Sequence, residues 1–349
     1  MIFSYKNMYH YAFALALITF AGYFGKQIQQ NFDTKERDEY EMIKKYLLND
    51  SPLYGYNKPK IWIHSKYEIN ARKWRDFGSP NTTDLNQPYL HLTIKSIINH
   101  CGNDFHICLI DDETFSKLIP SWDIDLSTVA EPMKSHFREM AMMQLVYFYG
   151  GMVVPNSFLC TKNLIDLYKE GTSNNLPFVC EQLNRTVNMS RQNHKLLFIP
   201  DIIFMGSEKN NETILKLIEY LKKRNLSPHF SCESDFKGEI SYLCIEAINN
   251  QQMNLIGGEM VGIKNNKHKP ILLEDLMEEN FLDLSPNAYG IYIPQDEVLK
   301  RTKYQWFAVL TGEQIMESNM ILSKYIKASI VDGSNEYKQS TQLKSVIAI

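Results

Sequence analysis

The feature that most constrains the fold is a helix pattern that runs without interruption into a glycine pair and a short apolar run. Residues 133–149 contain no Gly or Pro and carry Met, Ala, Leu and Gln, which favour helix. From Met140 onward the pattern is apolar almost all round, apart from Gln144, so we expect the second half of this helix to be buried. The pair Gly150 and Gly151 ends the helix, because glycine accepts the left-handed C-cap conformation without a Cβ penalty.

A buried strand is predicted directly after the glycine pair. Residues 152–154 are apolar and are followed by Pro155 and the turn-forming pair Asn156 and Ser157. A helix that feeds a core strand places the residues after that strand at the rim of a sheet, where ligands bind in open α/β folds. The pattern therefore predicts an α/β fold with a site near Asn156 and Ser157.

The rest of the chain mixes helix and strand patterns in the same way. Asp111 and Asp112 follow a predicted strand, and we expect them to cap the next helix, because Asp is stabilised in a first helical turn. Strand patterns lie at residues 60–64, 105–111, 178–181, 198–205 (a pair of strands), 253–263 and 289–294, and helix patterns at 87–100, 162–170, 212–223, 235–250 and 311–330.

Charge and motifs exclude several classes of function. The formal net charge of −3 offers no basic excess to neutralise phosphates, so we expect no nucleic-acid partner. The chain has no P-loop, no Gly-x-Gly-x-x-Gly, no His-Glu-x-x-His and no Gly-x-Ser-x-Gly. Its six cysteines show no zinc-ligand spacing; we expect buried thiols at Cys108, Cys160 and Cys180, with disulfides as the alternative in an oxidising compartment.

One segment resembles a known family. The pattern Glu139-x-x-Met142, then Leu145-x-Tyr147-x-Tyr149-Gly150-Gly151-Met152-Val153-Val154, resembles the core segment of DXD-motif glycosyltransferases of the α-mannosyl and capsular-polysaccharide type. The resemblance covers roughly residues 58–220. It implies a GT-A-like, Rossmann-type mixed sheet flanked by helices, and a hexosyltransferase-type activity with a nucleotide-sugar donor and a glycan or glycoconjugate acceptor as partners.

The resemblance also implies site residues. In that family the Asp-x-Asp holds a divalent metal and the donor diphosphate, and here Pro155-Asn156-Ser157 stands in its place. Glu139 stands where the family has Asp, and Met142 where it has Arg. The implied catalytic carboxylate is Asp201, whose alternative interpretation is a turn residue after Pro200. The implied donor-binding residues are His64, Arg138, Glu139, Gly150, Gly151, Asn156 and Ser157.

The missing carboxylates leave three hypotheses open. Asn156 and Ser157 are neutral and bind Mg²⁺ or Mn²⁺ weakly, so we expect no metal at this position, and no cofactor is certain. Metal ligands from elsewhere, Asp201 or the Asp-x-Asp at Asp123 and Asp125, are the second hypothesis, and a catalytically inactive binding or structural protein is the third. The first hypothesis is an active, metal-independent enzyme, in which cationic side chains stabilise the diphosphate instead of a metal. The candidate cations are Lys134, Arg138, Lys264, Lys267 and Arg301.

The N-terminal region predicts attachment to a membrane. Residues 8–25 are apolar and uncharged, and at about 1.5 Å per residue they can just cross a ~27–30 Å hydrocarbon layer. We expect a short tail at 1–7, a single-pass signal anchor at 8–25, a stem at 26–57, a glycosyltransferase-like domain at 58–330 and a disordered tail at 331–349. The resemblance implies a luminal or otherwise extracytoplasmic domain. Glycosylation sequences agree with this placement and occur at Asn81, Asn184, Asn188, Asn211 and Asn225.

Overall fold

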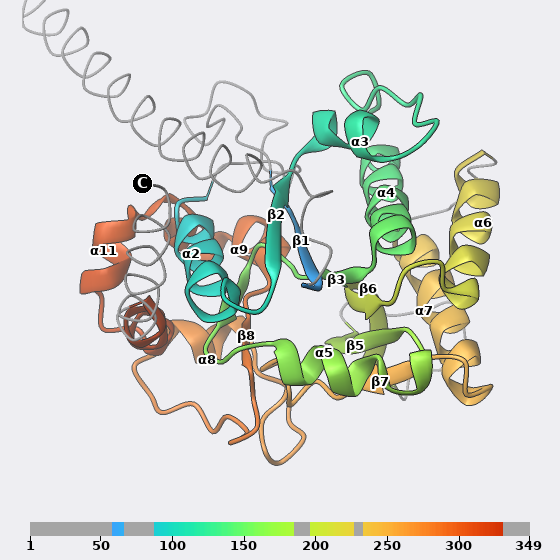
Figure 1. Cartoon of the computed structure of the whole chain (residues 1–349). Helices are drawn as coiled ribbons and strands as arrows, with labels where there is room; N and C mark the ends of the chain where they lie inside the picture. Colours follow the sequence, from blue (N-terminus) through green and yellow to red (C-terminus); the bar gives the residue numbers. More distant parts are fainter. Residues whose placement is uncertain (1–57, 66–86, 185–195, 227–232, 331–349) are drawn as a thin grey trace, which may run out of the picture.

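The computed structural model describes residues 58–65, 87–184, 196–226 and 233–330, which form a mixed α/β structure (Figure 1). Its centre is a six-stranded sheet with the strand order β2-β1-β3-β6-β5-β7. The strands of this sheet are β1 (Lys60–His64), β2 (His106–Ile110), β3 (Gly151–Val153), β5 (Phe178–Leu183), β6 (Phe198–Ser207) and β7 (Asn254–Ile256).

The pairing of the strands creates one edge suited to a binding site. β1 is parallel to β2 and β3, and β5 is parallel to β7. β6 lies antiparallel between β3 and β5, so its first residues share an edge with the carboxyl ends of all the other strands. Ligands of open α/β sheets bind at this carboxyl edge.

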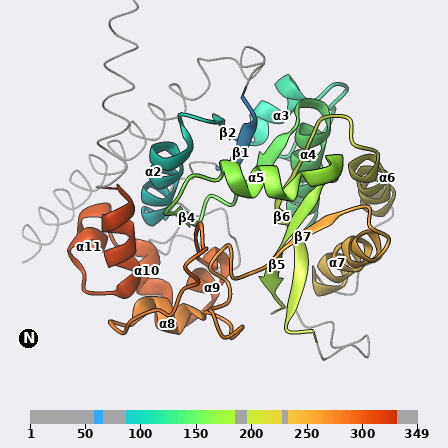
Figure 2. The same cartoon turned by 60° about the horizontal axis from the view of Figure 1, so that its bottom comes forward.

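Helices cover both faces of the sheet (Figures 1 and 2). The apolar cluster on one face joins the sheet to α4 (Met133–Tyr149), α6 (Glu212–Leu226) and α7 (Glu233–Asn249). The cluster on the other face joins it to α2 (Tyr89–Cys101), and α5 (Ile165–Gly171) adds Leu167 there. A sheet buried between two helical layers accounts for the continuous apolar runs of its strands.

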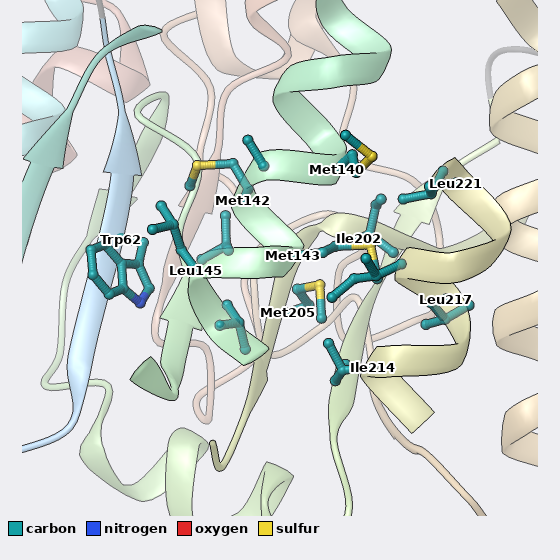
Figure 3. Close-up of a cluster of buried hydrophobic side chains, with 14 of the residues drawn as sticks. Trp62, Met140, Met142, Met143, Leu145, Ile202, Met205, Ile214, Leu217 and Leu221 are labelled. Atoms are coloured by element: carbon teal, nitrogen blue, oxygen red, sulfur yellow. The ribbon is translucent and has the colours of Figure 1, made fainter. Parts of the chain in front are cut away.

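The helix predicted at residues 133–149 is α4, with the same bounds, and the prediction that its second half is buried is confirmed for residues 140–146. Figure 3 shows its side chains between Trp62 of β1 and the leucines of α6. Because one helix contacts both strand and helix partners, apolar residues occur all round it instead of on a single stripe.

The turn from α4 into β3 depends on its two glycines. Gly150 has φ 70° and Gly151 φ 99°, conformations that other L-residues rarely adopt. The indole of Trp62 donates to the Gly150 carbonyl (Nε1–O 3.0 Å). A Cβ atom on Gly151 would lie 2.2 Å from the Lys60 carbonyl oxygen, so glycine lets β3 approach β1 closely.

A third apolar cluster lies beside the sheet and contains α8 (Leu273–Met277), α9 (Gln295–Lys300), α10 (Gln305–Val309) and α11 (Gly312–Glu317). A two-stranded ribbon of β4 (Phe158–Cys160) and β8 (Gly290–Tyr292) separates it from the sheet. In β4, Phe158 and Cys160 belong to the sheet cluster, whereas Leu159 belongs to the third cluster. The ribbon therefore contributes to both cores, as the alternation of side chains along a strand allows.

Several predicted elements differ from the structure. Residues 198–205 are not a pair of strands but part of the single strand β6. Pro200 is tolerated within β6 because no residue of the described β3 lies opposite it: β3 pairs only with residues 205–207. The missing N–H of Pro200 therefore removes no hydrogen bond between β6 and β3. The strand predicted at 253–263 is limited to β7, and turns follow it.

The closing helix predicted at 311–330 is also divided. It breaks at residues 318–320 between α11 and a helical segment at 321–330. The Ser318 hydroxyl donates to the Ile315 carbonyl (3.0 Å) and hydrogen-bonds Ser323 Oγ (2.6 Å), and such side-chain bonds compete with a continuing helix.

The membrane and glycosylation predictions have different outcomes. Within the described ranges, no helix is both long and apolar enough to cross a membrane. The predicted anchor (8–25), stem (26–57) and tail (331–349) lie outside those ranges and stay predictions. Asn225 is buried, with 5% of its surface exposed, which contradicts a glycan at that position. Asn211 caps α6, since its Oδ1 accepts from the Thr213 N–H (2.9 Å).

Candidate active site at the carboxyl edge of the sheet

A polar pocket of about 100 Å³ opens where β5 and β6 reach the carboxyl edge of the sheet. A closed cavity of ~150 Å³ holds a six-membered ring, so this pocket is too small to enclose one completely. Its walls are partly apolar, with Ile199, Ile203 and Pro294 among them. Its polar lining consists of Gln182, Asp201, Lys237, Tyr292 and Asp296.

Separate parts of the chain bring these polar side chains together. Gln182 comes from β5 and Asp201 from β6, next to a register shift between Val179 and Cys180 that changes the direction of the following residues. Lys237 comes from α7, which packs against β6. Tyr292 ends β8, and Asp296 lies in the first turn of α9.

Asp201 is the carboxyl group most affected by this environment. Burial raises its pKa above the usual range, although the Lys237 ammonium lowers the pKa and Asp296 raises it further. The Asp201 Oδ1 also accepts a hydrogen bond from the Ile203 N–H (3.0 Å), which favours the ionised form. A carboxylate with a raised pKa is a stronger base than an ordinary aspartate, and catalytic sites often hold carboxyl groups in this condition.

Unsatisfied polar atoms lie at the pocket and close to it. The Nε2 atom of Gln182 is buried and has no hydrogen-bond partner within the described structure. The hydroxyl of Tyr89 is also buried without a partner among the described residues. Burial raises the pKa of Tyr89, and Tyr292 and Asp296, which both line the pocket, raise it further.

Asn156 and Ser157 lie behind one wall of the pocket. The Ser157 carbonyl accepts from the Ile293 N–H (3.1 Å), directly between the lining residues Tyr292 and Pro294. The Asn156 carbonyl accepts from the Thr93 hydroxyl (2.5 Å). Asn156 and Ser157 thus lie close to the pocket that contains Asp201, but neither of them lines it.

Other implied donor-binding residues have different surroundings. Gly150 directly precedes β3 and Gly151 is its first residue, so both lie at the opposite end of that strand, in the turn described above. Glu139 is partly buried on α4 and does not line the pocket. The structure therefore does not bring these three residues to Asp201.

His64 and Arg138 meet at Asp112 farther along the carboxyl edge. Arg138 donates through Nε to Asp112 Oδ1 (2.8 Å) and through Nη2 to Oδ2 (2.6 Å), and His64 Nε2 lies 3.0 Å from Oδ1. Burial alone would raise the pKa of Asp112, but Arg138 and His64 outweigh it and hold that pKa well below its usual range. Of the two predicted helix caps, Asp111 caps the helix, because its Oδ1 accepts from the Thr114 N–H (3.1 Å). Asp112 instead anchors the buried ion pair with Arg138.

The alternative metal ligands Asp123 and Asp125 lie at a second, larger hollow of about 340 Å³ with an acidic lining. The Asp125 carboxylate already accepts from the Ser127 N–H (2.9 Å) and hydroxyl (2.7 Å). Among the residues that the structure describes, no three His, Cys, Asp or Glu side chains come together as a set of metal ligands. The acidic lining also disfavours an anionic diphosphate.

Several candidate cations form ion pairs. Lys264 is buried between Glu181 and Glu259, and Arg301 pairs with Glu274. Lys267 is exposed, 3.8 Å from Asp283. Lys237 is the cation that lines the pocket, and sequence reasoning missed it because its position on α7 carries no motif.

Comparisons with known proteins leave the family of the chain open. No protein-family model and no curated protein matches it. Among solved structures it is similar to the PaToxG glycosyltransferase at 12% sequence identity, over 86% of this chain and 97% of that chain, with a TM-score of 0.31. Such a TM-score is too low to assign a function, so the pocket itself must carry the assignment.

Proposed function

We propose that the protein transfers a sugar from a nucleotide-sugar donor to a hydroxyl group of a glycan or glycoconjugate acceptor, with Asp201 as the general base. One observation carries the proposal: a desolvated carboxyl group lies in a polar pocket at the carboxyl edge of the sheet. The sequence resemblance to DXD-motif glycosyltransferases, which singled out Asp201, supports the same reaction class.

In the proposed reaction, the acceptor oxygen attacks the anomeric carbon of the donor sugar. The bond from that carbon to the diphosphate oxygen breaks, and its electron pair leaves with the diphosphate. The acceptor proton passes to the Asp201 carboxylate. General-base catalysis of this kind contributes about 10²- to 10⁴-fold to a rate.

The other pocket residues have binding roles in this proposal. Asp296 accepts hydrogen bonds from sugar hydroxyls, and the amide of Gln182 and the phenol of Tyr292 donate to sugar oxygens. Lys237 supplies positive charge near the leaving diphosphate, where stabilisation of developing negative charge lowers the barrier. We place no metal at Pro155-Asn156-Ser157; a metal held elsewhere is a question for the experiment below.

The proposed setting follows the sequence. Residues 8–25 anchor the protein in a membrane as a single-pass segment, and the catalytic domain, of GT-A type, is luminal or otherwise extracytoplasmic. Protease protection of the full-length protein in intact microsomes tests this placement: a luminal domain resists added protease until detergent opens the vesicles.

The alternative function is a glycosyltransferase-like binding protein that has lost catalysis. The specific observation in its favour is that two candidate cations, Arg138 and Lys264, are already paired with Asp112 and with Glu181. Such a protein would bind a nucleotide sugar or glycan without turnover.

The experiment screens the full-length protein against UDP-, GDP- and CMP-sugars, each with Mn²⁺ and with EDTA. A ligand at about 100 times its Kd adds about 2.7 kcal/mol of stability, which a thermal shift detects. Release of nucleotide, lost in Asp201→Asn, supports transfer, and EDTA resistance supports the metal-independent form. Binding without release from any donor supports the alternative, and a donor that turns over equally well with Asp201→Asn contradicts the role of Asp201.

A further inference from the structure

Two of the buried glutamines, equally exposed, differ in whether they line the pocket. Gln144 on α4 and Gln182 on β5 each have 7% of their surface exposed. Each has a buried amide atom without a partner in the described structure, Oε1 in Gln144 and Nε2 in Gln182. Gln182 lines the Asp201 pocket, whereas Gln144 does not.

The unpaired amide of Gln182 has a physical cost. A buried donor without a partner destabilises a protein, so such groups usually find a partner. Because the Gln182 side chain lines the pocket, a rotation of its amide would give Nε2 a ligand oxygen as partner. The Asp201 and Asp296 carboxyl groups line the same pocket and supply acceptors for ligand hydroxyls.

We propose that Gln182 is a specificity-determining residue, whose Nε2 donates a hydrogen bond to an oxygen of an uncharged, hydroxylated ring. This inference rests on the proposed sugar-binding role of the pocket. A ring hydroxyl can accept from Gln182 and donate to a carboxylate at once, and the apolar walls at Ile199 and Ile203 suit the C–H face of a sugar.

The charges of the pocket select against an acidic sugar. Its lining carries two carboxyl groups, Asp201 and Asp296, and one ammonium group, Lys237. A ring carboxylate placed there would meet like charges in a partly desolvated space, where repulsion is stronger than in water. A neutral hexose meets no such penalty, so the pocket favours it over a hexuronic acid.

The test measures binding of free sugars to the full-length protein by saturation-transfer NMR and titration. The probes are neutral methyl hexosides (gluco, manno and galacto) and the corresponding hexuronic acids. The variants are Gln182→Leu and its matched control Gln144→Leu. Each removes one unpaired buried amide, so thermal unfolding should occur no earlier than in the wild type, which verifies that both variants are folded.

We expect at least one neutral hexoside to bind the wild type and Gln144→Leu equally well. The same hexoside should bind Gln182→Leu about 2- to 10-fold more weakly, because this variant loses one neutral hydrogen bond to the ligand. Equal binding by both variants, the absence of binding by every neutral hexoside, or preference for a hexuronic acid would overturn the inference. Because binding is measured without a nucleotide sugar, hexoside binding that depends on Gln182 supports the inference even if no donor is ever turned over. Donor turnover without hexoside binding would leave the proposed function standing and this inference overturned.

Discussion

At the scale of single residues, Asp201 combines a stability cost with a proposed chemical role. Its folded-state pKa is raised, so the folded protein holds the proton more tightly than the unfolded chain does. The contribution of Asp201 to the stability of the fold is therefore fully present below the unfolded pKa, ~3.9. It is lost as the pH rises through the pKa of Asp201 in the folded protein. At neutral pH the ionised carboxylate opposes folding.

The variant Asp201→Asn should consequently unfold at a higher temperature than the wild type at pH 7 and lose about 10²- to 10⁴-fold of the transfer rate. Thermal unfolding at pH 4 and pH 7, together with the transfer assay, measures both effects. Asp283→Asn, at an exposed carboxylate, should change neither. A destabilised but fully active Asp201→Asn would instead show a structural carboxylate that serves the Ile203 N–H.

Asp112 should show the opposite dependence on pH. Its pKa is lowered by Arg138 and His64, so its contribution is present above the unfolded pKa of ~3.9 and is lost as the pH falls through the folded value. The side chains of Asp112 and Arg138 are only 8% and 11% exposed, and removal of one partner of such a pair costs about 3–5 kcal/mol.

We therefore expect Asp112→Asn to lower the free energy of unfolding by about this amount at pH 7, and by progressively less in strongly acidic solution. Urea denaturation at a series of pH values measures the difference. The surface pair of Lys267 and Asp283 provides the comparison, since its disruption should cost at most ~1 kcal/mol. A difference that stayed constant down to strong acid would argue against the ion pair as its cause.

At the scale of elements, the turn from α4 to β3 sets the distance between neighbouring strands. Gly151→Ala would combine a φ of 99° with a Cβ atom 2.2 Å from the Lys60 carbonyl oxygen. We expect a loss of at least about 2 kcal/mol, because the backbone strain alone costs ~1–3 kcal/mol. Gly258→Ala is the matched control, since its nearest contact would be an ordinary 3.4 Å and its φ is not positive. Urea unfolding measures the free energy of unfolding of the two variants. Equal values would show that β1 and β3 adjust to the added methyl group.

The same turn shows what could be predicted from the sequence. The bounds of α4 and β1 match the prediction, because an uninterrupted helix pattern ended by glycine and a short apolar run opened by proline are local signals. The resemblance also singled out Asp201, which lines the pocket; its catalytic role stays a prediction. The break at residues 318–320 was missed, because Ser318 reads as an ordinary helix residue until its hydroxyl reaches Ser323.

Most of the pocket could not be predicted, for a different reason. Gln182, Lys237 and Asp296 belong to a strand, a helix on one face and a helix beyond the ribbon. They meet only because β5 pairs with β6, α7 packs on β6 and β8 pairs with β4. Such long-range register leaves no periodicity in the sequence, so these residues are identified only by their geometry.

At the scale of the whole molecule, the ribbon joins the sheet to the helices beside it. Leu322 is fully buried in the third cluster, which also contains Leu159 of β4. We expect Leu322→Ala to cost about 2–5 kcal/mol and to shift a single unfolding transition, because the alternating side chains of β4 couple the two cores. Far-ultraviolet circular dichroism and tryptophan fluorescence during urea unfolding should coincide. Leu255→Ala, at a side chain that is 41% exposed, should change stability little, and two separate transitions for Leu322→Ala would refute the coupling.

One hydrogen bond of this region has a consequence for synthesis of the chain. The Ser329 hydroxyl donates to the Cys160 carbonyl of β4 (2.5 Å), across 169 residues of sequence. At roughly 5–20 residues per second, a ribosome needs on the order of ten to thirty seconds to make that interval. A nascent chain therefore carries an incompletely covered β4 for about half of its translation, and the ribbon acquires its last partner only as the domain leaves the ribosome.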